Sequence, residues 1–149
     1  TGDKSSDFLY KCLFNAKISN QETSNHINDG LKLKNAFITP ALKCVPPEDK
    51  PLKIELDNCS KFFNNELNIL KNLRVVVALG KIAFDTCKIF YKEKFDIPKE
   101  VQFGHGKTYK LKNGVNLVGC YHPSPRNVNT GRINEKMMTE LFNKIKKII

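Results

Sequence analysis

Long apolar runs are missing from this sequence, and their absence excludes a membrane-spanning protein. The longest apolar stretch is the short run Val75–Leu79, whereas a transmembrane helix needs about 20 apolar residues. The N-terminal residues also lack the apolar core of a secretory signal peptide. We therefore expect a cytoplasmic protein with no membrane contact.

Closely spaced cysteine pairs are missing as well. The five cysteines are an odd number and widely scattered, at positions Cys12, Cys44, Cys59, Cys87 and Cys120. In a chain without an export signal, such cysteines are typically reduced thiols or metal ligands and do not form disulfides.

Acidic residues are scarce relative to basic ones. The 149 residues include 25 Lys and Arg against 15 Asp and Glu, which gives a net charge of +10. This excess favours a polyanionic partner, with nucleic acid first and an anionic membrane surface second. Hydrophobic residues make up 40% and charged residues 27%, which is typical of one folded domain.

An initiating methionine is absent, because the chain begins at Thr1. The segment Thr1–Asp3 is typical of the end of a loop. We therefore expect residues 1–149 to be a single domain that lacks its N-terminal portion, as a fragment or a processed product.

Apolar periodicity predicts strands that alternate with helices. Helices are expected at Phe8–Ala16, Leu56–Leu70, Ile82–Tyr91 and Asn134–Ile149, strands at Ala36–Leu42, Arg74–Gly80 and Val115–Tyr121, and a hairpin around Asn113-Gly114. This alternation favours an α/β fold with a parallel sheet. Chemistry in such sheets gathers past the C-terminal ends of strands, which indicates the loops Cys44–Pro51, Gly80–Lys81 and His122–Arg132.

His122 directly follows an apolar strand and is fixed by Pro123. At a strand end, it is positioned to donate a hydrogen bond to charge that develops on a leaving group. A polar turn that merely ends the strand explains the pattern equally well.

Asp3 and His105 also have two interpretations each. Asp3 either holds a water molecule or caps the helix at Phe8–Ala16, and its local sequence favours the cap. His105 stands between two glycines, where it either lines a groove or occupies an exposed turn, and the turn is favoured.

Cys44 and Cys59 form no CxxC pair, so ordinary thiols are the simpler interpretation. Two thiolates could instead supply half of a four-cysteine cluster. Gly80 follows a strand, but the sequence after it lacks the further glycines of a phosphate-binding loop. A tight turn from strand to helix is therefore favoured there.

A set of short motifs, in order from the first residue to the last, resembles the B-type, or fifth-family, uracil-DNA glycosylases of the uracil-DNA glycosylase superfamily. The matching pieces are Thr1-Gly2-Asp3, Lys43-Cys44-Val45-Pro46-Pro47, Val76-Val77-Ala78-Leu79-Gly80, Phe103-Gly104-His105-Gly106, Tyr121-His122-Pro123-Ser124, Asn127 and Thr130-Gly131-Arg132. Any one of these motifs is common, whereas the ordered set is specific.

The resemblance implies a three-layer α/β/α sandwich around a short parallel sheet. It also implies an enzyme that flips uracil, and other deaminated bases such as hypoxanthine, out of DNA. Such an enzyme hydrolyses the N-glycosidic bond without cutting the strand. By this resemblance Asp3 positions or activates water, His122 stabilises the departing base, and Asn127 helps to hold base or backbone.

The same resemblance assigns residues to DNA and to a cofactor. The loop Pro125–Arg132 is expected to press into the minor groove. The residues expected to contact substrate or DNA are Asp49, His105, Ser124, Pro125, Arg126, Asn127 and Arg132. Cys44 and Cys59 are expected to be two of four ligands to a 4Fe-4S cluster.

The sequence departs from the family pattern in two ways. The family's first strand and its other two cluster cysteines would lie upstream of Thr1, so they are absent from this chain. Asp49 stands where the family usually has asparagine, and an ionised acid cannot donate a hydrogen bond as an amide does.

Other functions compatible with the sequence are a non-catalytic iron–sulfur nucleic-acid-binding module and a nucleotide-binding domain that uses Gly80. The expected protein is a monomer whose partner is DNA that contains uracil or deaminated bases.

Overall fold

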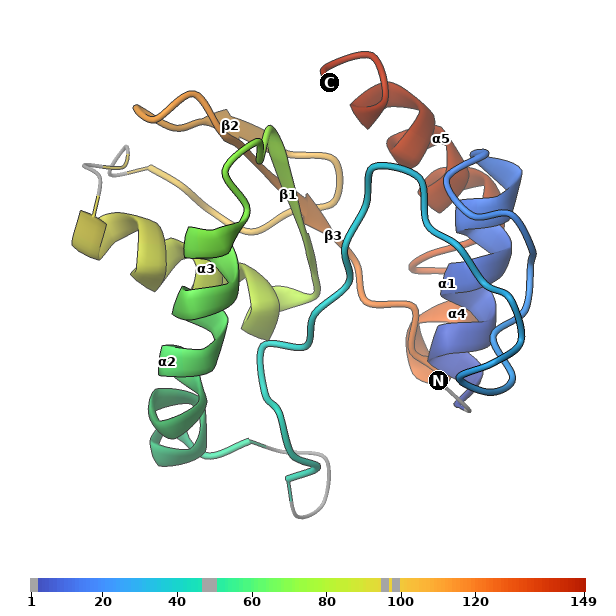
Figure 1. Ribbon diagram of the computed structural model, residues 1–149, viewed down its shortest axis with the longest axis horizontal. Helices are drawn as coiled ribbons and strands as arrows, with labels where there is room; N and C mark the ends of the chain where they lie inside the picture. The colour runs from blue at the N-terminus through green and yellow to red at the C-terminus, as the bar shows by residue number, and fades with distance from the viewer. Residues whose placement is uncertain (1–2, 47–50, 95–96, 98–99) are drawn as a thin grey trace. The chain divides into compact units, whose positions relative to one another are not determined.

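Two compact units make up the chain in the computed structural model (Figure 1), which describes residues 3–46, 51–94, 97 and 100–149. One unit comprises Thr1–Phe37 and Cys120–Ile149, and the other comprises Ile38–Gly119. We refer to them as the terminal unit and the central unit, and each is described by itself.

The central unit contains the sheet. Its strands are β1 (Val75–Leu79), β2 (Thr108–Lys110) and β3 (Asn116–Cys120), in the order β1-β3-β2. β2 pairs antiparallel with β3, and Tyr109 lies opposite Leu117. The hairpin predicted around Asn113-Gly114 is confirmed, with Gly114 at φ +86°, and the sheet is therefore mixed where a parallel one was predicted.

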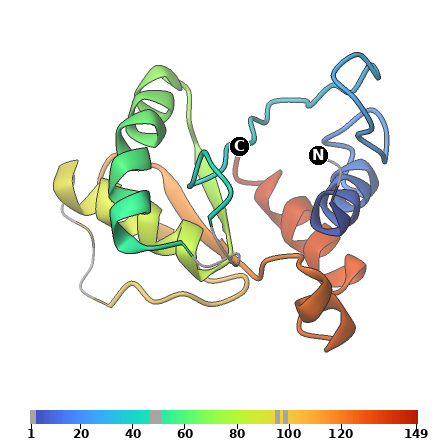
Figure 2. The same cartoon turned by 90° about the horizontal axis from the view of Figure 1, so that it is seen from below.

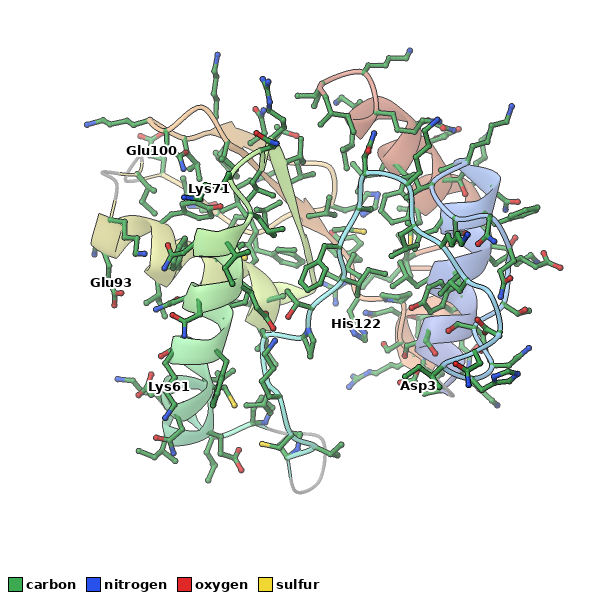
Figure 3. All side chains as sticks on the ribbon, viewed as in Figure 1. Asp3, Lys61, Lys71, Glu93, Glu100 and His122 are labelled. Carbon is green, nitrogen blue, oxygen red and sulfur yellow. The ribbon has the colours of Figure 1, made fainter. Side chains whose placement is uncertain are left out.

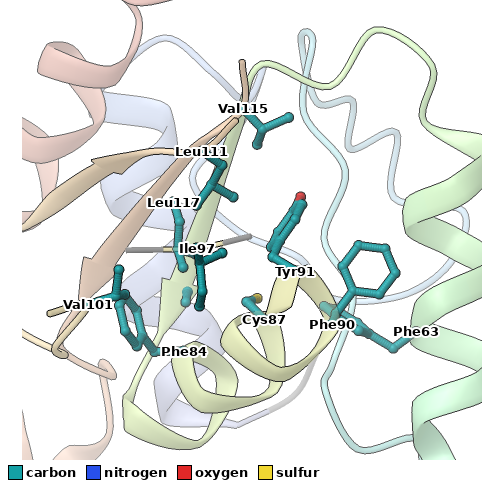
Figure 4. Close-up of a cluster of buried hydrophobic side chains, with 11 residues drawn as sticks. Phe63, Phe84, Cys87, Phe90, Tyr91, Ile97, Val101, Leu111, Val115 and Leu117 are labelled. Atoms are coloured by element: carbon teal, nitrogen blue, oxygen red, sulfur yellow. The ribbon is translucent and has the colours of Figure 1, made fainter. Parts of the chain in front are cut away.

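In the central unit, α3 (Lys81–Lys94) packs against β1, and α2 (Lys53–Ile69) packs against α3. Gly80 makes the turn from β1 into α3 at φ +95°, which confirms the predicted tight turn. Between α3 and the strands lies an apolar core that includes Phe84, Tyr91 and Leu117, all of them at most 1% exposed (Figure 4).

The terminal unit is helical. It contains α1 (Lys4–Asn15), the short α4 (Pro125–Asn129) and α5 (Glu135–Ile145), and α1 packs against α5 (Figures 1 and 2). Its buried side chains recur at helical spacing on α5 as predicted, at Met138, Leu141, Phe142 and Ile145. Asn134 caps this helix by accepting a hydrogen bond from the Met137 amide at 2.9 Å.

Two predictions of secondary structure are wrong. Ala36–Leu42 is an irregular segment and not a buried strand, with Phe37 60% exposed. Pro40 has no N–H to donate to a β-ladder, and no described strand pairs with the segment. The segment Pro125–Arg132 is not wholly a loop, because Ser124 and Pro125 are a favourable N-cap and first residue for α4.

Within the described ranges, we find no helix that is both long and apolar enough to span a membrane.

Candidate functional site

Asp3 is the N-cap of α1. Its Oδ1 accepts a hydrogen bond from the Ser6 amide at 2.6 Å, and the Ser6 hydroxyl completes a capping box. These hydrogen bonds lower the pKa of the Asp3 carboxyl below 3.8, chiefly through the Ser6 amide. Asp3 is therefore an exposed carboxylate, ionised at neutral pH, at the positive end of a helix. The cap predicted from the sequence is confirmed.

His122 lies two residues beyond the end of β3. The Pro123 side chain that follows is fully buried, which fixes the backbone, while the imidazole itself reaches solvent. Partial burial by surrounding protein lowers the pKa of His122 below 6.5, and the negative charge of Asp3 acts in the opposite direction. Asp3 is thus close enough to His122 to influence its charge, and the imidazole is neutral at pH 7 (both are labelled in Figure 3).

Asn127 connects α4 to His122. Its side-chain amide donates a hydrogen bond to the His122 carbonyl oxygen at 2.8 Å. Its own carbonyl oxygen accepts from the Ile133 amide at 3.3 Å, and Ile133 is fully buried. The Ser124 hydroxyl accepts from the Asn127 amide at 3.4 Å. Asn127 therefore ties the turn at His122 to the core of the terminal unit.

The two arginines of this segment are in different surroundings. Arg126 and Pro125 are exposed at the start of α4. The Arg132 guanidinium lies 4.6 Å from the centre of the Tyr121 ring, a favourable cation–π distance. Since Tyr121 precedes His122 in the chain, Arg132 steadies the backbone at the strand end.

The terminal unit thus contains most of the predicted site residues: Asp3, His122, Ser124, Pro125, Arg126, Asn127 and Arg132. His105, Cys44 and Cys59 belong to the central unit. Asp49 lies outside the described residues.

His105 occupies a turn that is bound to β3. The Gly106 amide donates to the Gly119 carbonyl oxygen at 2.8 Å, and the Gly119 amide donates to the Lys107 carbonyl oxygen at 2.9 Å. A side chain at Gly119 would meet the Gly104 carbonyl oxygen at 2.4 Å, so the close approach requires glycine there. The predicted turn is confirmed, and it is anchored one residue before the end of β3.

Cys44 and Cys59 come together within the central unit. Partial desolvation raises the pKa of the Cys44 thiol, and a hydrogen bond with the Cys59 thiol raises it further. The Lys43 amide donates to the Cys59 sulfur at 3.4 Å. Cys44 is exposed, whereas Cys59 is 7% exposed. The described residues form no group of three or more metal-binding side chains, so these two thiols stand alone in the part of the chain that can be described.

The remaining cysteines are apolar core residues. Cys12, Cys87 and Cys120 are buried, and burial raises the pKa of Cys87 and Cys120 to about 12. All three are therefore protonated at neutral pH, and their burial distinguishes them from the exposed Cys44.

Sequence reasoning did not pair Ser6 with Asp3 or Tyr121 with Arg132. The Asp3-x-x-Ser6 spacing resembles a capping box and was available as a signal. No sequence signal pairs Tyr121 with Arg132, because their contact depends on the path of the chain through α4.

Comparison with known proteins identifies the class. Residues 1–146 match the family model described as the uracil-DNA glycosylase superfamily. The chain therefore belongs to this superfamily, whose fold agrees with the α/β sandwich that the sequence predicts.

Relatives narrow the resemblance to one type. Over 149 residues the chain is 37% identical to the type-5 uracil-DNA glycosylase of Mycobacterium bovis and 36% identical to that of Thermus thermophilus. It is 27% identical over 99 residues to the type-4 uracil-DNA glycosylase of Archaeoglobus fulgidus. These alignments cover 99% of this chain for the type-5 relatives and confirm the predicted resemblance to the fifth family. The chain spans 55% of the M. bovis relative and 66% of the T. thermophilus relative.

Proposed function

We propose that this chain takes part in the excision of uracil from DNA by hydrolysis of the N-glycosidic bond. One observation carries the proposal: Asp3 and His122, the residues that the motifs pair, lie within electrostatic range of each other in a member of the uracil-DNA glycosylase superfamily. The mycobacterial and Thermus relatives, which are named type-5 uracil-DNA glycosylases, support uracil as the base.

The chemistry requires two charges to be stabilised. As the glycosidic bond breaks, negative charge grows on the base and positive charge grows on the sugar. The neutral His122 imidazole can donate a hydrogen bond to the base oxygen, and a preorganised donor of this kind is typically worth about 10²–10³ in rate. The Asp3 carboxylate favours the cationic sugar and can position the water that attacks it.

Contacts to DNA follow from the exposed groups around α4. We propose that the segment around α4 enters the minor groove and holds the duplex open. Its proposed contact residues are Ser124, Pro125, Arg126, Asn127 and Arg132. His105 and Asp49 are proposed to contact the substrate or DNA, and hypoxanthine is a second base that this chain is proposed to release. The proposed partner is a duplex with a deaminated base, bound by a monomer.

Cys44 and Cys59 suit two of the four ligands of a 4Fe-4S cluster. The Cys59 thiol lies close enough to Cys44 to raise the pKa of the Cys44 thiol, and the Lys43 amide already donates to the Cys59 sulfur, as amides do to cluster sulfurs. Such a cluster would need two further thiolates. Its contribution would be to cross-link the irregular segment around Cys44 to α2.

The cluster is tested by iron and sulfide analysis of the full-length gene product, which should supply the two further thiolates, purified without oxygen. Cys44→Ala and Cys59→Ala should each lose most of the iron and the visible absorbance. Cys87→Ala, which removes a buried thiol of the core, is the matched control and should keep both. Equal iron content in all three variants would contradict the assignment.

The activity is tested by quantifying free uracil released from a duplex with one U·G mismatch. The chain should release uracil and leave an intact abasic strand, and the T. thermophilus type-5 enzyme serves as the positive control. A duplex with hypoxanthine tests the second base. A folded chain that releases neither base would overturn the proposal.

A further inference from the structure

The central unit contains a cavity that the proposed chemistry does not use. Its volume is about 250 Å³, and it is walled by the end of α2, the second half of α3 and the turn of the hairpin. Its apolar wall includes Leu67, Phe90, Tyr91 and Val115, the last three of which also belong to the core cluster in Figure 4. Its polar wall includes Asn68, Lys71, Lys94 and Asn113.

The Lys94 ammonium is already positioned at this wall. Its Nζ donates to the Asn68 side-chain oxygen at 2.7 Å and lies 4.7 Å from the centre of the Phe90 ring. An ammonium group has three N–H donors, so it can still bind an anion. Asn68 uses its oxygen for Lys94, which leaves its amide N–H groups to donate to a ligand.

Positive charge continues from the cavity along the end of the sheet where β1 and β3 begin. The Arg74 carbonyl oxygen accepts from the Asn116 amide at 2.9 Å, and Asn116 lies opposite Lys110 in the β2–β3 register. Arg74, immediately before β1, and Lys110, at the end of β2, therefore flank the start of β3. Both are exposed, as is Lys71.

Acidic residues are absent from the segments that build this end of the sheet. Residues 67–84 and 101–134 contain no Asp or Glu. Glu66 and Glu93 adjoin the cavity residues Leu67 and Lys94 in sequence, but neither glutamate lines the cavity (Glu93 is labelled with Lys71 in Figure 3). Among the described residues, the ion pairs are elsewhere: Lys11–Glu135, Lys43–Glu66 and Lys81–Asp85.

We propose that this cavity binds one unstacked nucleotide of a single-stranded nucleic acid. A thymine or uracil base has flat apolar faces for the apolar wall and carbonyl oxygens for the amide donors of Asn68 and Asn113. Lys71 and Lys94 then neutralise its phosphate, and Arg74 and Lys110 meet the neighbouring phosphates. A charged surface that extends beyond one nucleotide is typical of proteins that bind single strands. This site is independent of Asp3 and His122.

The test is an NMR titration of the ¹⁵N-labelled chain with a uracil-free octathymidylate. Amide shifts are expected at Asn68, Lys71 and Asn113. Lys71→Glu with Lys94→Glu should weaken binding about tenfold or more, because two phosphate contacts are lost. The control is the double variant Lys61→Glu with Lys92→Glu, which makes the same change of charge on exposed lysines of α2 and α3. It should weaken binding less than about threefold, because only the net charge of the chain changes.

Three results would overturn the proposal. The two double variants could lose the same amount of affinity for the oligonucleotide, or the amide shifts could be confined to residues 121–132. The third is that a polyglutamate peptide shifts the cavity amides while the oligonucleotide does not. If the double variant does not fold, Lys71→Glu alone is compared with the unmodified chain. Lys94 donates a hydrogen bond to Asn68 that Lys94→Glu would break, whereas Lys71→Glu leaves that bond intact. Uracil release is measured in parallel, and it should be unchanged in Lys71→Glu.

Discussion

The His122 imidazole experiences two opposing influences. Burial lowers its pKa below 6.5, and the Asp3 carboxylate raises it by a smaller amount. Because the neutral form predominates at pH 7, His122 can donate a hydrogen bond without carrying a charge. Asp3 remains ionised, since the α1 amides lower its pKa. The two residues therefore have fixed and different protonation states at neutral pH, as a pair with two roles requires.

This difference gives a prediction for His122. Its pKa, measured from the imidazole carbon protons by NMR, should be below 6.5 and should fall further in Asp3→Asn, because the charge that raises it is removed. The unfolded chain takes up a proton on His122 near pH 6.5 that the folded chain does not. The contribution of His122 to stability is therefore present above pH 6.5 and declines as the pH falls toward the folded pKa. A pKa that rises in Asp3→Asn would contradict the assignment.

Among the helices and strands, the short helix α4 serves mainly to hold the backbone at His122 in place, and we call it a brace for that reason. It has five residues, too few to be stable alone. Its contacts run from Asn127 to the His122 carbonyl oxygen and to Ile133. The segment after β3 is therefore fixed at both ends, which is what a donor of fixed direction needs.

Asn127→Ala tests this brace. The variant loses the hydrogen bond to His122, and the free energy of unfolding should fall by about 0.5–1.5 kcal/mol in urea titrations. Uracil release should slow by more than this loss of stability explains, because His122 is no longer aligned. Asn129→Ala, two residues away and exposed on the same helix, should change both quantities little. Equal effects of the two substitutions would show that Asn127 is not a brace.

The sequence predicted some helices and strands better than others. The α5 stripe Met138, Leu141, Phe142 and Ile145 follows helical spacing, so local pattern and packing agree. Ala36–Leu42 is apolar enough for a strand, but a strand also needs a partner, and pairing is a property of the whole fold. For the same reason the motifs predicted Asp3, His122 and Asn127 as site residues, while the Asn127–His122 bond and the Arg132–Tyr121 stack required the structure.

The lysine-rich cavity of the central unit was beyond sequence reasoning for a similar reason. Asn68 and Lys94 are 26 residues apart, and no spacing rule joins them. Only the packing of α2 and α3 brings their side chains together.

For the whole molecule, we expect the net charge of +10 to dominate the proposed interaction with DNA. Each phosphate that a cation neutralises releases counterions, so affinity should fall linearly on logarithmic axes as salt rises, with a slope of about 0.9 per phosphate contact. We predict a steep slope for both uracil-containing and undamaged duplexes, measured by fluorescence anisotropy. An affinity that does not depend on salt would contradict an electrostatic interaction.

Single-turnover uracil release from a duplex measures whether Asp3 and His122 perform the chemistry. His122→Ala should slow release by about 10²–10³, and Asp3→Asn should also slow it strongly. Both variants should bind abasic DNA with nearly unchanged affinity, because neither residue is proposed to bind the backbone. If Asp3→Asn retains near-normal turnover, Asp3 is only the cap of α1 and the account of the chemistry is wrong.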